Sequence, residues 1–263
     1  MTDPFDDWLA AAEKRYLADL TRPELGRALR ALSSCYVERR GKLAEGAPLA
    51  TAGKRAAFAL FYGPLHFLTV RAIAQNSIAV EAQHASPSEL GTGQPSSARP
   101  VYDLGCGTGA AGAAWALVRG GTVHGYDVNP WAVNEAAWTY RTLGISGTTS
   151  RVPLEKVRFP TTPATLLAAY LVNELPEEAR AALLPRLLKA ARERCEVIVV
   201  EPISRTLTPW WASWQREFEQ AGGRFDEWRF KAELPPLLRD LDRSSGLDHK
   251  ELTAKSLRIG LKA

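Results

Sequence analysis

Four glycines fall within the stretch VYDLGCGTGAAG, residues 101–112, and two carboxylates accompany them. Asp103 comes just before the glycines, and Asp127 ends the next apolar run. Glycine loses more conformational freedom on folding than any other residue, so such a cluster marks backbone that turns sharply or touches another group. These residue types predict a site where main chain lies against a ligand and acids contact its polar groups.

A predicted strand and a predicted helix flank these glycines. Residues 100–104 form a short apolar run, and residues 109–120 are rich in alanine. Ligands of open α/β sheets bind outside the carboxyl ends of the strands, where the strand order reverses. The following helix adds unpaired backbone N–H groups at its N-terminus. We therefore expect the turn 105–109 to face a ligand, the alternative being a tight turn without one.

The residues after the glycines restrict which ligand this is. A nucleoside triphosphate needs a lysine and a hydroxyl there, and Ala110 and Ala111 stand in their place, which excludes a P-loop. A dinucleotide remains compatible, because Gly105-x-Gly107-x-x-Ala110 fits the loose dinucleotide pattern. Asp127 also lies near the expected distance, about 20 residues on, for an acid that binds ribose hydroxyls.

The run Asp103-Leu-Gly-Cys-Gly-Thr-Gly109 resembles the first motif of class I S-adenosylmethionine-dependent methyltransferases, and GYDVNPWAV resembles their second. The resemblance implies that Asp103 holds the aminopropyl end of the cofactor, where a carboxylate suits an ammonium and a sulfonium and repels a pyrophosphate. It implies that Asp127 binds the ribose hydroxyls. Asn129 either supports that contact or caps the helix begun by Pro130, and capping is favoured. The predicted cofactor-binding residues are Asp103, Gly105, Cys106, Gly107, Gly109, Asp127 and Asn129.

Short apolar runs alternate with helical patterns from residue 100 onward. The predicted strands cover 100–104, 122–128, 164–172 and 195–202, with helices at 129–144 and 175–194 between them. This alternation predicts a parallel sheet covered on both faces. The runs 224–234 and 255–263 predict a closing antiparallel pair. The resemblance implies a Rossmann-like α/β fold: a seven-stranded mixed sheet with helices on both faces, after an all-helical N-terminal region.

The segment after the fourth predicted strand, YLVNELP, is where the family places its substrate-side residues. Asn173 and Glu174 are the predicted catalytic residues, orienting an amine or hydroxyl acceptor; equally, they start the helix after Pro176. The segment lacks both the Asn-Pro-Pro-aromatic motif of base-amino methyltransferases and the cysteine of pyrimidine-carbon enzymes. Glu201 and His249 are weaker candidates. Cys106 has no base beside it and is predicted to be a small filler rather than a nucleophile.

Residues 1–80 predict a helical region, 81–99 a flexible linker, and 100–263 the cofactor-binding domain. Apolar residues recur at helical spacing over 5–20, and the helix over 49–75 is expected to kink or restart at Gly63-Pro64. The linker is rich in Ser, Pro, Gly and Gln.

The segments CYVERRGKL, AAFALFYGPLHFLTVRAI and AAYLVNELPEEAR resemble the small-ribosomal-subunit assembly methyltransferase-like family. This implies a ribosomal RNA partner, bound through the N-terminal helices. The family's four-cysteine metal ligand set is absent from this chain, which has three cysteines, so no metal is expected. The basic residues that suit phosphates are Arg39, Arg40, Lys42, Lys54, Arg55 and Arg71. Five aromatic residues either stack on bases or pack in a core, and the core is slightly favoured; they are Tyr36, Phe58, Phe61, Tyr62 and Phe67.

The bulk properties of the chain are compatible with several partners. A net charge of +4 and a pI near 9.0 permit nucleic acid without requiring it. The three cysteines lie far apart and the N-terminus is acidic, so we expect a cytoplasmic protein without a targeting segment or an apolar stretch of membrane-spanning length. Trp210, Trp211 and Trp214 are predicted to pack, with a substrate lid as the alternative. Three functions remain open: an RNA methyltransferase, a non-catalytic assembly factor of this fold, and a methyltransferase for small molecules or proteins.

Overall fold

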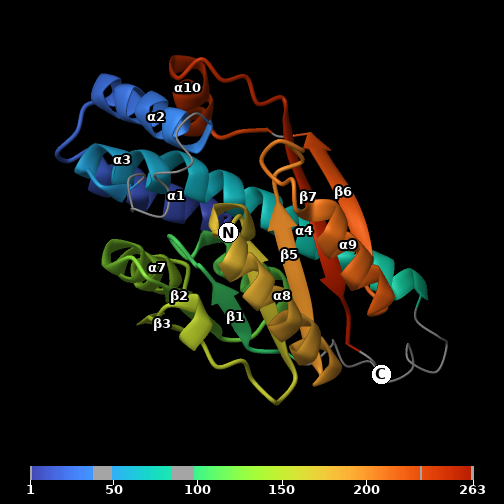
Figure 1. The fold of residues 1–263 in the computed structure, drawn as a ribbon. Helices are drawn as coiled ribbons and strands as arrows, with labels where there is room; N and C mark the ends of the chain where they lie inside the picture. Colours follow the sequence, from blue (N-terminus) through green and yellow to red (C-terminus); the bar gives the residue numbers. More distant parts are fainter. Residues whose placement is uncertain (1, 38–48, 85–97, 232, 262–263) are drawn as a thin grey trace.

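The computed structural model describes residues 2–37, 49–84, 98–231 and 233–261 of the 263-residue chain. Its centre is a seven-stranded sheet of order β3-β2-β1-β4-β5-β7-β6 (Figure 1). The strands are β1 (Val101–Leu104), β2 (Val123–Asp127), β3 (Gly147–Arg151), β4 (Ala164–Ala169), β5 (Cys195–Glu201), β6 (Arg224–Lys231) and β7 (Glu251–Ile259). The first five are parallel, and β7 runs antiparallel to both β5 and β6. The predicted seven-stranded mixed sheet is confirmed.

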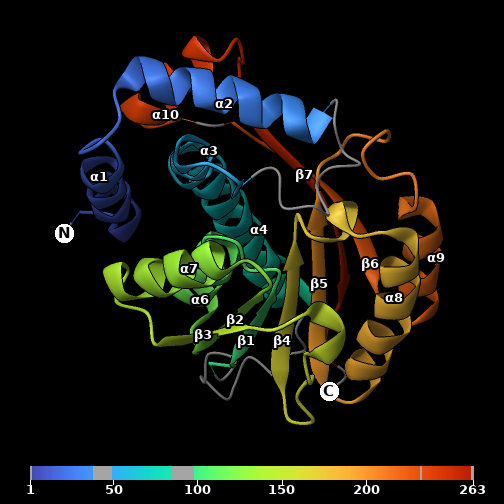
Figure 2. The same ribbon diagram turned by 60° about the vertical axis from the view of Figure 1, so that its left-hand side comes forward.

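Strand β5 shows why the sheet is covered on both faces. All seven of its residues are buried, as expected for a central strand with a near-continuous apolar sequence. Ile198 and Val200 pack into the hydrophobic cluster on one face, and Val197 and Val199 into the cluster on the other. The first cluster contains residues of α6 (Ala110–Arg119) and α7 (Pro130–Thr142), and the second contains residues of α8 (Glu177–Arg192) and α9 (Trp211–Gln220) (Figure 2).

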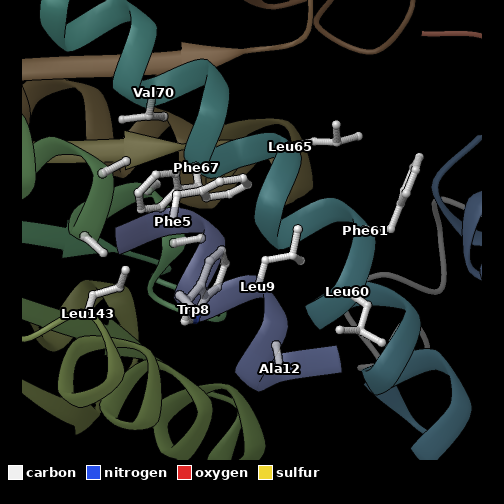
Figure 3. Close-up of a cluster of buried hydrophobic side chains, with 14 of the residues drawn as sticks. Phe5, Trp8, Leu9, Ala12, Leu60, Phe61, Leu65, Phe67, Val70 and Leu143 are labelled. Atoms are coloured by element: carbon white, nitrogen blue, oxygen red, sulfur yellow. The ribbon is translucent and has the colours of Figure 1, made fainter. Parts of the chain in front are cut away.

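The N-terminal helices belong to the same core as the sheet. They are α1 (Pro4–Tyr16), α2 (Arg22–Val37), α3 (Ala52–Ala57) and α4 (Gly63–His84). Phe5 and Trp8 of α1 stack on Phe67 of α4, with ring centroids 4.9 and 5.6 Å apart, and Leu143 after α7 lies in the same cluster (Figure 3). Helix α10 (Pro236–Ser244) packs against α2. A single apolar cluster therefore joins the predicted helical region to the predicted cofactor domain.

Helix α4 bears on three sequence-based expectations. It continues to His84, so the linker predicted from residue 81 begins inside a helix; residues 85–97 lie outside the described part of the chain. The new start expected at Gly63-Pro64 is present, since α4 begins at Gly63. The change is one of helix type: a π-helical turn, η3 (Phe58–Tyr62), joins α3 to α4, and the Gly63 N–H donates to the Phe58 carbonyl five residues back. Proline cannot donate the next helical bond, and the wider turn accommodates it.

The third expectation concerns membrane-spanning length. Residues Ala52–Ile78 are long and apolar enough to cross a membrane, and their most apolar 18-residue window has a mean hydropathy of 1.3, so the expectation that no segment reaches that length was wrong. However, 67% of the most apolar window is buried inside the protein. Core helices of soluble proteins have the same character, because they are apolar all round.

Some strand boundaries also differ from those predicted from the sequence. The strand predicted over 164–172 ends at Ala169, because Tyr170 adopts φ +58°, and a short 3₁₀ turn, η5 (Val172–Glu174), follows. Strand β3 and helix α10 were not predicted. The sequence of β3, GTTSR, is polar because the strand lies at the sheet edge and is largely exposed.

Candidate functional site

A cavity of 390 Å³ lies at the carboxyl ends of the central strands. The strand order reverses between β1 and β4, which are neighbours in the sheet, and this is the position where α/β sheets bind ligands. The walls of the cavity come from the β1–α6 turn, the end of β2, the segment after β4, the π-helical turn η3 and helix α4.

The glycine turn has the backbone that its sequence predicts. Gly105, Gly107 and Gly109 have φ of +63°, +52° and +76°, values that side chains rarely adopt. A Cβ at Gly105 would collide with Leu171 Cδ1, and one at Gly109 would lie 2.9 Å from Ala136 Cα. The turn is thus held closely between the segment after β4 and helix α7, with Gly105 and Gly107 at the cavity wall.

Asp103 lies at the cavity wall with only 1% of its surface exposed. Its Oδ2 accepts a hydrogen bond of 3.0 Å from the Gly112 N–H in α6. Burial raises the pKa of Asp103 to about 7, because a charged carboxylate loses its hydration there. A cationic ligand group beside this carboxyl would favour its ionised form.

Asp127 ties the end of β2 to the glycine turn. Its Oδ2 accepts from the Gly107 N–H at 3.0 Å, and its Oδ1 accepts from the Asn129 N–H at 2.8 Å. Burial raises its pKa. Each carboxylate oxygen retains a further lone pair for a ligand hydroxyl. Asn129 caps α7: its Oδ1 accepts from the Trp131 and Ala132 N–H groups at 2.9 and 3.3 Å. The favoured capping role is confirmed.

Cys106 is buried between the glycines, and its N–H donates to the Tyr126 carbonyl at 3.0 Å. Burial and two nearby carboxylates raise the pKa of the thiol well above its usual range, so the thiol stays protonated and is a poor nucleophile. Within the described part of the chain, no group of three or more His, Cys, Asp or Glu side chains is placed to hold a metal ion.

The two predicted catalytic residues have different surroundings. Glu174 lines the cavity, whereas Asn173 is not among its lining residues. Asn173 Nδ2 donates to Glu201 Oε2 at 2.6 Å and to the Tyr170 carbonyl at 3.1 Å, and its N–H donates to Glu201 Oε1 at 3.0 Å. Asn173 therefore fixes the segment that carries Glu174. Neither residue starts the next helix, since α8 begins at Glu177 behind Pro176.

Glu201 is fully buried at the end of β5, and burial raises its pKa to about 7. It pairs in register with Lys255 of β7. The Lys255 ammonium donates to Thr208 Oγ1 at 2.6 Å and lies 4.4 Å from the centroid of the Trp211 ring. Glu201 thus supports the segment after β4 through Asn173, and Lys255 contacts the segment after β5. His249 is bound to Asp242, with Nδ1 2.5 Å from Oδ1 and its N–H donating to Oδ2 at 2.7 Å, and it is not a lining residue.

Sequence reasoning missed two ring side chains of the cavity, His66 and Tyr170. Their rings stack with centroids 3.9 Å apart and an interplanar angle of 12°. Burial lowers the pKa of His66 to about 3, so the imidazole is neutral. Its one sequence signal is a histidine within the otherwise apolar run of α4.

The residues predicted to bind RNA are only partly available. Phe61 and Phe67 are fully buried, so the favoured core role is confirmed for both and stacking on bases is excluded. Arg71 pairs with Asp3 at 2.6 Å, and Arg55 Nε donates to the Leu49 carbonyl at 2.8 Å. Arg39, Arg40 and Lys42, and the side chain of Tyr36, lie outside the described residues. Of the three neighbouring tryptophans, Trp211 and Trp214 are buried, as packing predicts, and the Trp210 ring is tilted against Trp211 and edge-on to Trp214.

The charged residues that line the cavity are acidic. Asp103, Asp127 and Glu174 line it, and the described lining residues include no Lys or Arg. Such a cavity suits a ligand with positive charge and hydroxyl groups, and it disfavours a pyrophosphate.

No protein-family model matches the chain, and no curated protein matches it either. Solved structures with a similar arrangement include magnesium protoporphyrin IX methyltransferase from Synechocystis PCC 6803 with bound SAM, at 13% identity, with 91% of this chain and 97% of that chain covered and a TM-score of 0.46. The 23S rRNA methyltransferase ErmE is 15% identical, with 74% and 68% covered and a TM-score of 0.43. The [4+2]-cyclase SpnF is 17% identical, with 63% and 76% covered and a TM-score of 0.41.

Proposed function

We propose that this protein is an S-adenosylmethionine-dependent methyltransferase. The observation that supports the proposal best is the acid-lined cavity at the sheet's switch point, with the glycine turn as one wall and Asp103 and Asp127 beside it. S-adenosylmethionine carries a sulfonium, an ammonium and two ribose hydroxyls, and acids suit all of them. A dinucleotide would bring its pyrophosphate next to these carboxylates.

The residues present fit this cofactor. Asp127 would hold the ribose hydroxyls, Asp103 the cationic end, and the backbone of Gly105 and Gly107 the adjoining atoms. When bound, the cofactor supplies an electrophilic methyl group for in-line displacement. The chain's own part is to exclude water and orient the acceptor, and alignment of this kind supplies a large share of the rate.

The acceptor that the sequence resemblance implies is ribosomal RNA of the small subunit, and we propose it as the first substrate to test. One observation favours a second candidate, a small molecule: Phe58 and His66 of the N-terminal helices line the cavity itself, as a pocket wall would. A non-catalytic assembly factor would bind RNA without transferring a methyl group.

Calorimetric titration with S-adenosylmethionine and S-adenosylhomocysteine tests the cofactor. We expect binding that Asp127→Asn weakens, while Asp248→Asn, at an exposed carboxylate that pairs with Lys250, leaves it unchanged. Absence of binding to the wild-type protein would refute the proposal.

Labelled cofactor then separates the acceptors. Incorporation of methyl groups into total RNA favours the RNA enzyme, and incorporation into the small-molecule fraction favours the second candidate. Binding of ribosomal RNA that weakens steeply with salt, without any transfer, favours the assembly factor.

A further inference from the structure

Three ring side chains from distant parts of the sequence line one cavity. Phe58 belongs to the π-helical turn, His66 to α4, and Tyr170 follows β4. The His66 ring stacks on Tyr170 at 3.9 Å and meets Phe58 edge-on at 6.1 Å, with an interplanar angle of 83°. The cavity therefore has an aromatic wall in addition to the acidic residues that we assign to the cofactor.

Two uncommon backbone conformations carry this wall. Phe58 starts the π-helical turn, and Tyr170 has φ +58° without being glycine. The strained Tyr170 is held in place because its N–H donates to the Val200 carbonyl at 2.7 Å and its own carbonyl accepts from Asn173 Nδ2. Both kinds of conformation are energetically unfavourable and are found most often at functional sites.

His66 offers polar atoms that the protein itself does not use. Among the described residues its ring nitrogens have no hydrogen-bond partner, and burial is the only cause that lowers its pKa. The neutral imidazole at the cavity wall has one N–H and one lone pair. A polar group in such surroundings is costly unless a ligand or water satisfies it.

The charges of the cavity restrict the acceptor. Asp103, Asp127 and Glu174 would repel an anionic acceptor, and no described lining residue is Lys or Arg. A protonated amine has no lone pair with which to attack a methyl group. The acceptor must therefore react as a neutral group, which matches a wall formed by an uncharged imidazole and the rings of Phe58 and Tyr170.

We propose that His66 hydrogen-bonds the methyl acceptor, and that Phe58 and Tyr170 contact a flat, uncharged ring of that acceptor. This inference rests on the proposed methyltransferase function. It makes the N-terminal helices part of the active site, so that residues 100–263 alone do not contain a complete acceptor site.

The first test compares His66→Phe with His124→Phe. His66→Phe keeps a ring against Tyr170 but removes both nitrogens. The control residue, His124, lies in β2 and does not line the cavity. Its Nδ1 lies 2.9 Å from Thr148 Oγ1. Both variants should bind S-adenosylhomocysteine as tightly as the wild type. His66→Phe should lower methyl transfer to the accepting fraction of a cell extract on the order of tenfold, and the control should leave it unchanged.

A second test needs no known acceptor. Diethyl pyrocarbonate modifies unprotonated, accessible imidazole nitrogens, and mass spectrometry can follow the chain's 4 histidines separately. We expect His66 to react both in the free protein and in protein saturated with S-adenosylhomocysteine, because His66 borders the acceptor space and not the cofactor.

The outcomes decide between the proposals. Absence of S-adenosylhomocysteine binding to the wild-type protein would refute the proposed function itself. Two results overturn the role of His66 alone: wild-type transfer by His66→Phe, or protection of His66 from the reagent by S-adenosylhomocysteine without any acceptor. If no extract fraction accepts a methyl group, the modification experiment decides alone.

Discussion

Replacing Gly105 with alanine tests whether the glycine turn is as tightly enclosed as the structure indicates. Gly105 has φ +63°, and an added Cβ would collide with Leu171 Cδ1 and lie 3.1 and 3.2 Å from Leu171 Cγ and Cδ2. The left-handed backbone costs a non-glycine residue about 1–2 kcal/mol. Forcing Leu171 out of its packed position adds about 1–3 kcal/mol. We expect Gly105→Ala to lower the free energy of unfolding by about 2–5 kcal/mol.

Gly144→Ala is the matched control. Gly144 has nearly the same backbone, φ +66°, but nothing lies within 4 Å of an added Cβ. This variant should show the backbone cost alone, about 1–2 kcal/mol. The difference between the two variants therefore measures the collision with Leu171, and urea denaturation of both proteins gives it directly.

The same pair of variants separates folding from binding. Gly105 and Leu171 both line the cavity, so Gly105→Ala should also weaken S-adenosylhomocysteine binding, whereas Gly144→Ala should not. Adding Leu171→Ala to Gly105→Ala should recover part of the lost stability, because it removes the atoms that collide. Equal destabilisation by Gly105→Ala and Gly144→Ala would refute our description of the turn.

Three further predictions follow from the buried polar groups. The pKa of Asp103 is raised to about 7, so a cationic cofactor that needs the carboxylate should bind about tenfold more tightly at pH 8 than at pH 6; calorimetry should show a weaker pH dependence in Asp103→Asn. The pKa of Glu201 is raised in the folded protein from 4.5 to about 7, so the folded state holds the proton more strongly than the unfolded state. Stability should therefore fall as pH rises from 5 to 8, and Glu201→Gln should reduce that fall in urea denaturation. Asn129→Ala removes the cap of α7 and should lower the free energy of unfolding by about 1 kcal/mol. An unchanged melting temperature would contradict the capping role.

Features encoded within a few residues could be predicted from the sequence. The glycine turn, the cap at Asn129 and the buried strand β5 each depend on a local pattern, and the structure contains all three. The antiparallel end of the sheet was also predicted, on the strength of two apolar runs and a family resemblance.

Features that depend on distant contacts could not be predicted. His66 and Tyr170 are more than a hundred positions apart, and only the packing of α4 on α6 and the sheet brings their rings together. Strand β3 has a polar sequence because one side of it has no neighbouring strand, so it lacks the apolar signal of a strand. The π-helical turn at Phe58 is a response to Pro64 within a packed helix, for which no single residue is diagnostic.

The position of β7 between β5 and the edge strand β6 has a consequence for biosynthesis. Strand β6 can join the sheet only through β7, since β7 lies between β5 and β6. In a nascent chain, β6 therefore has no neighbouring strand until residues up to Ile259 have left the ribosome. Trp228 and Phe230 are partly buried in the finished protein, and during that interval they are exposed and can associate with other chains. Any chain terminated before β7 would lose two strands of the sheet at once.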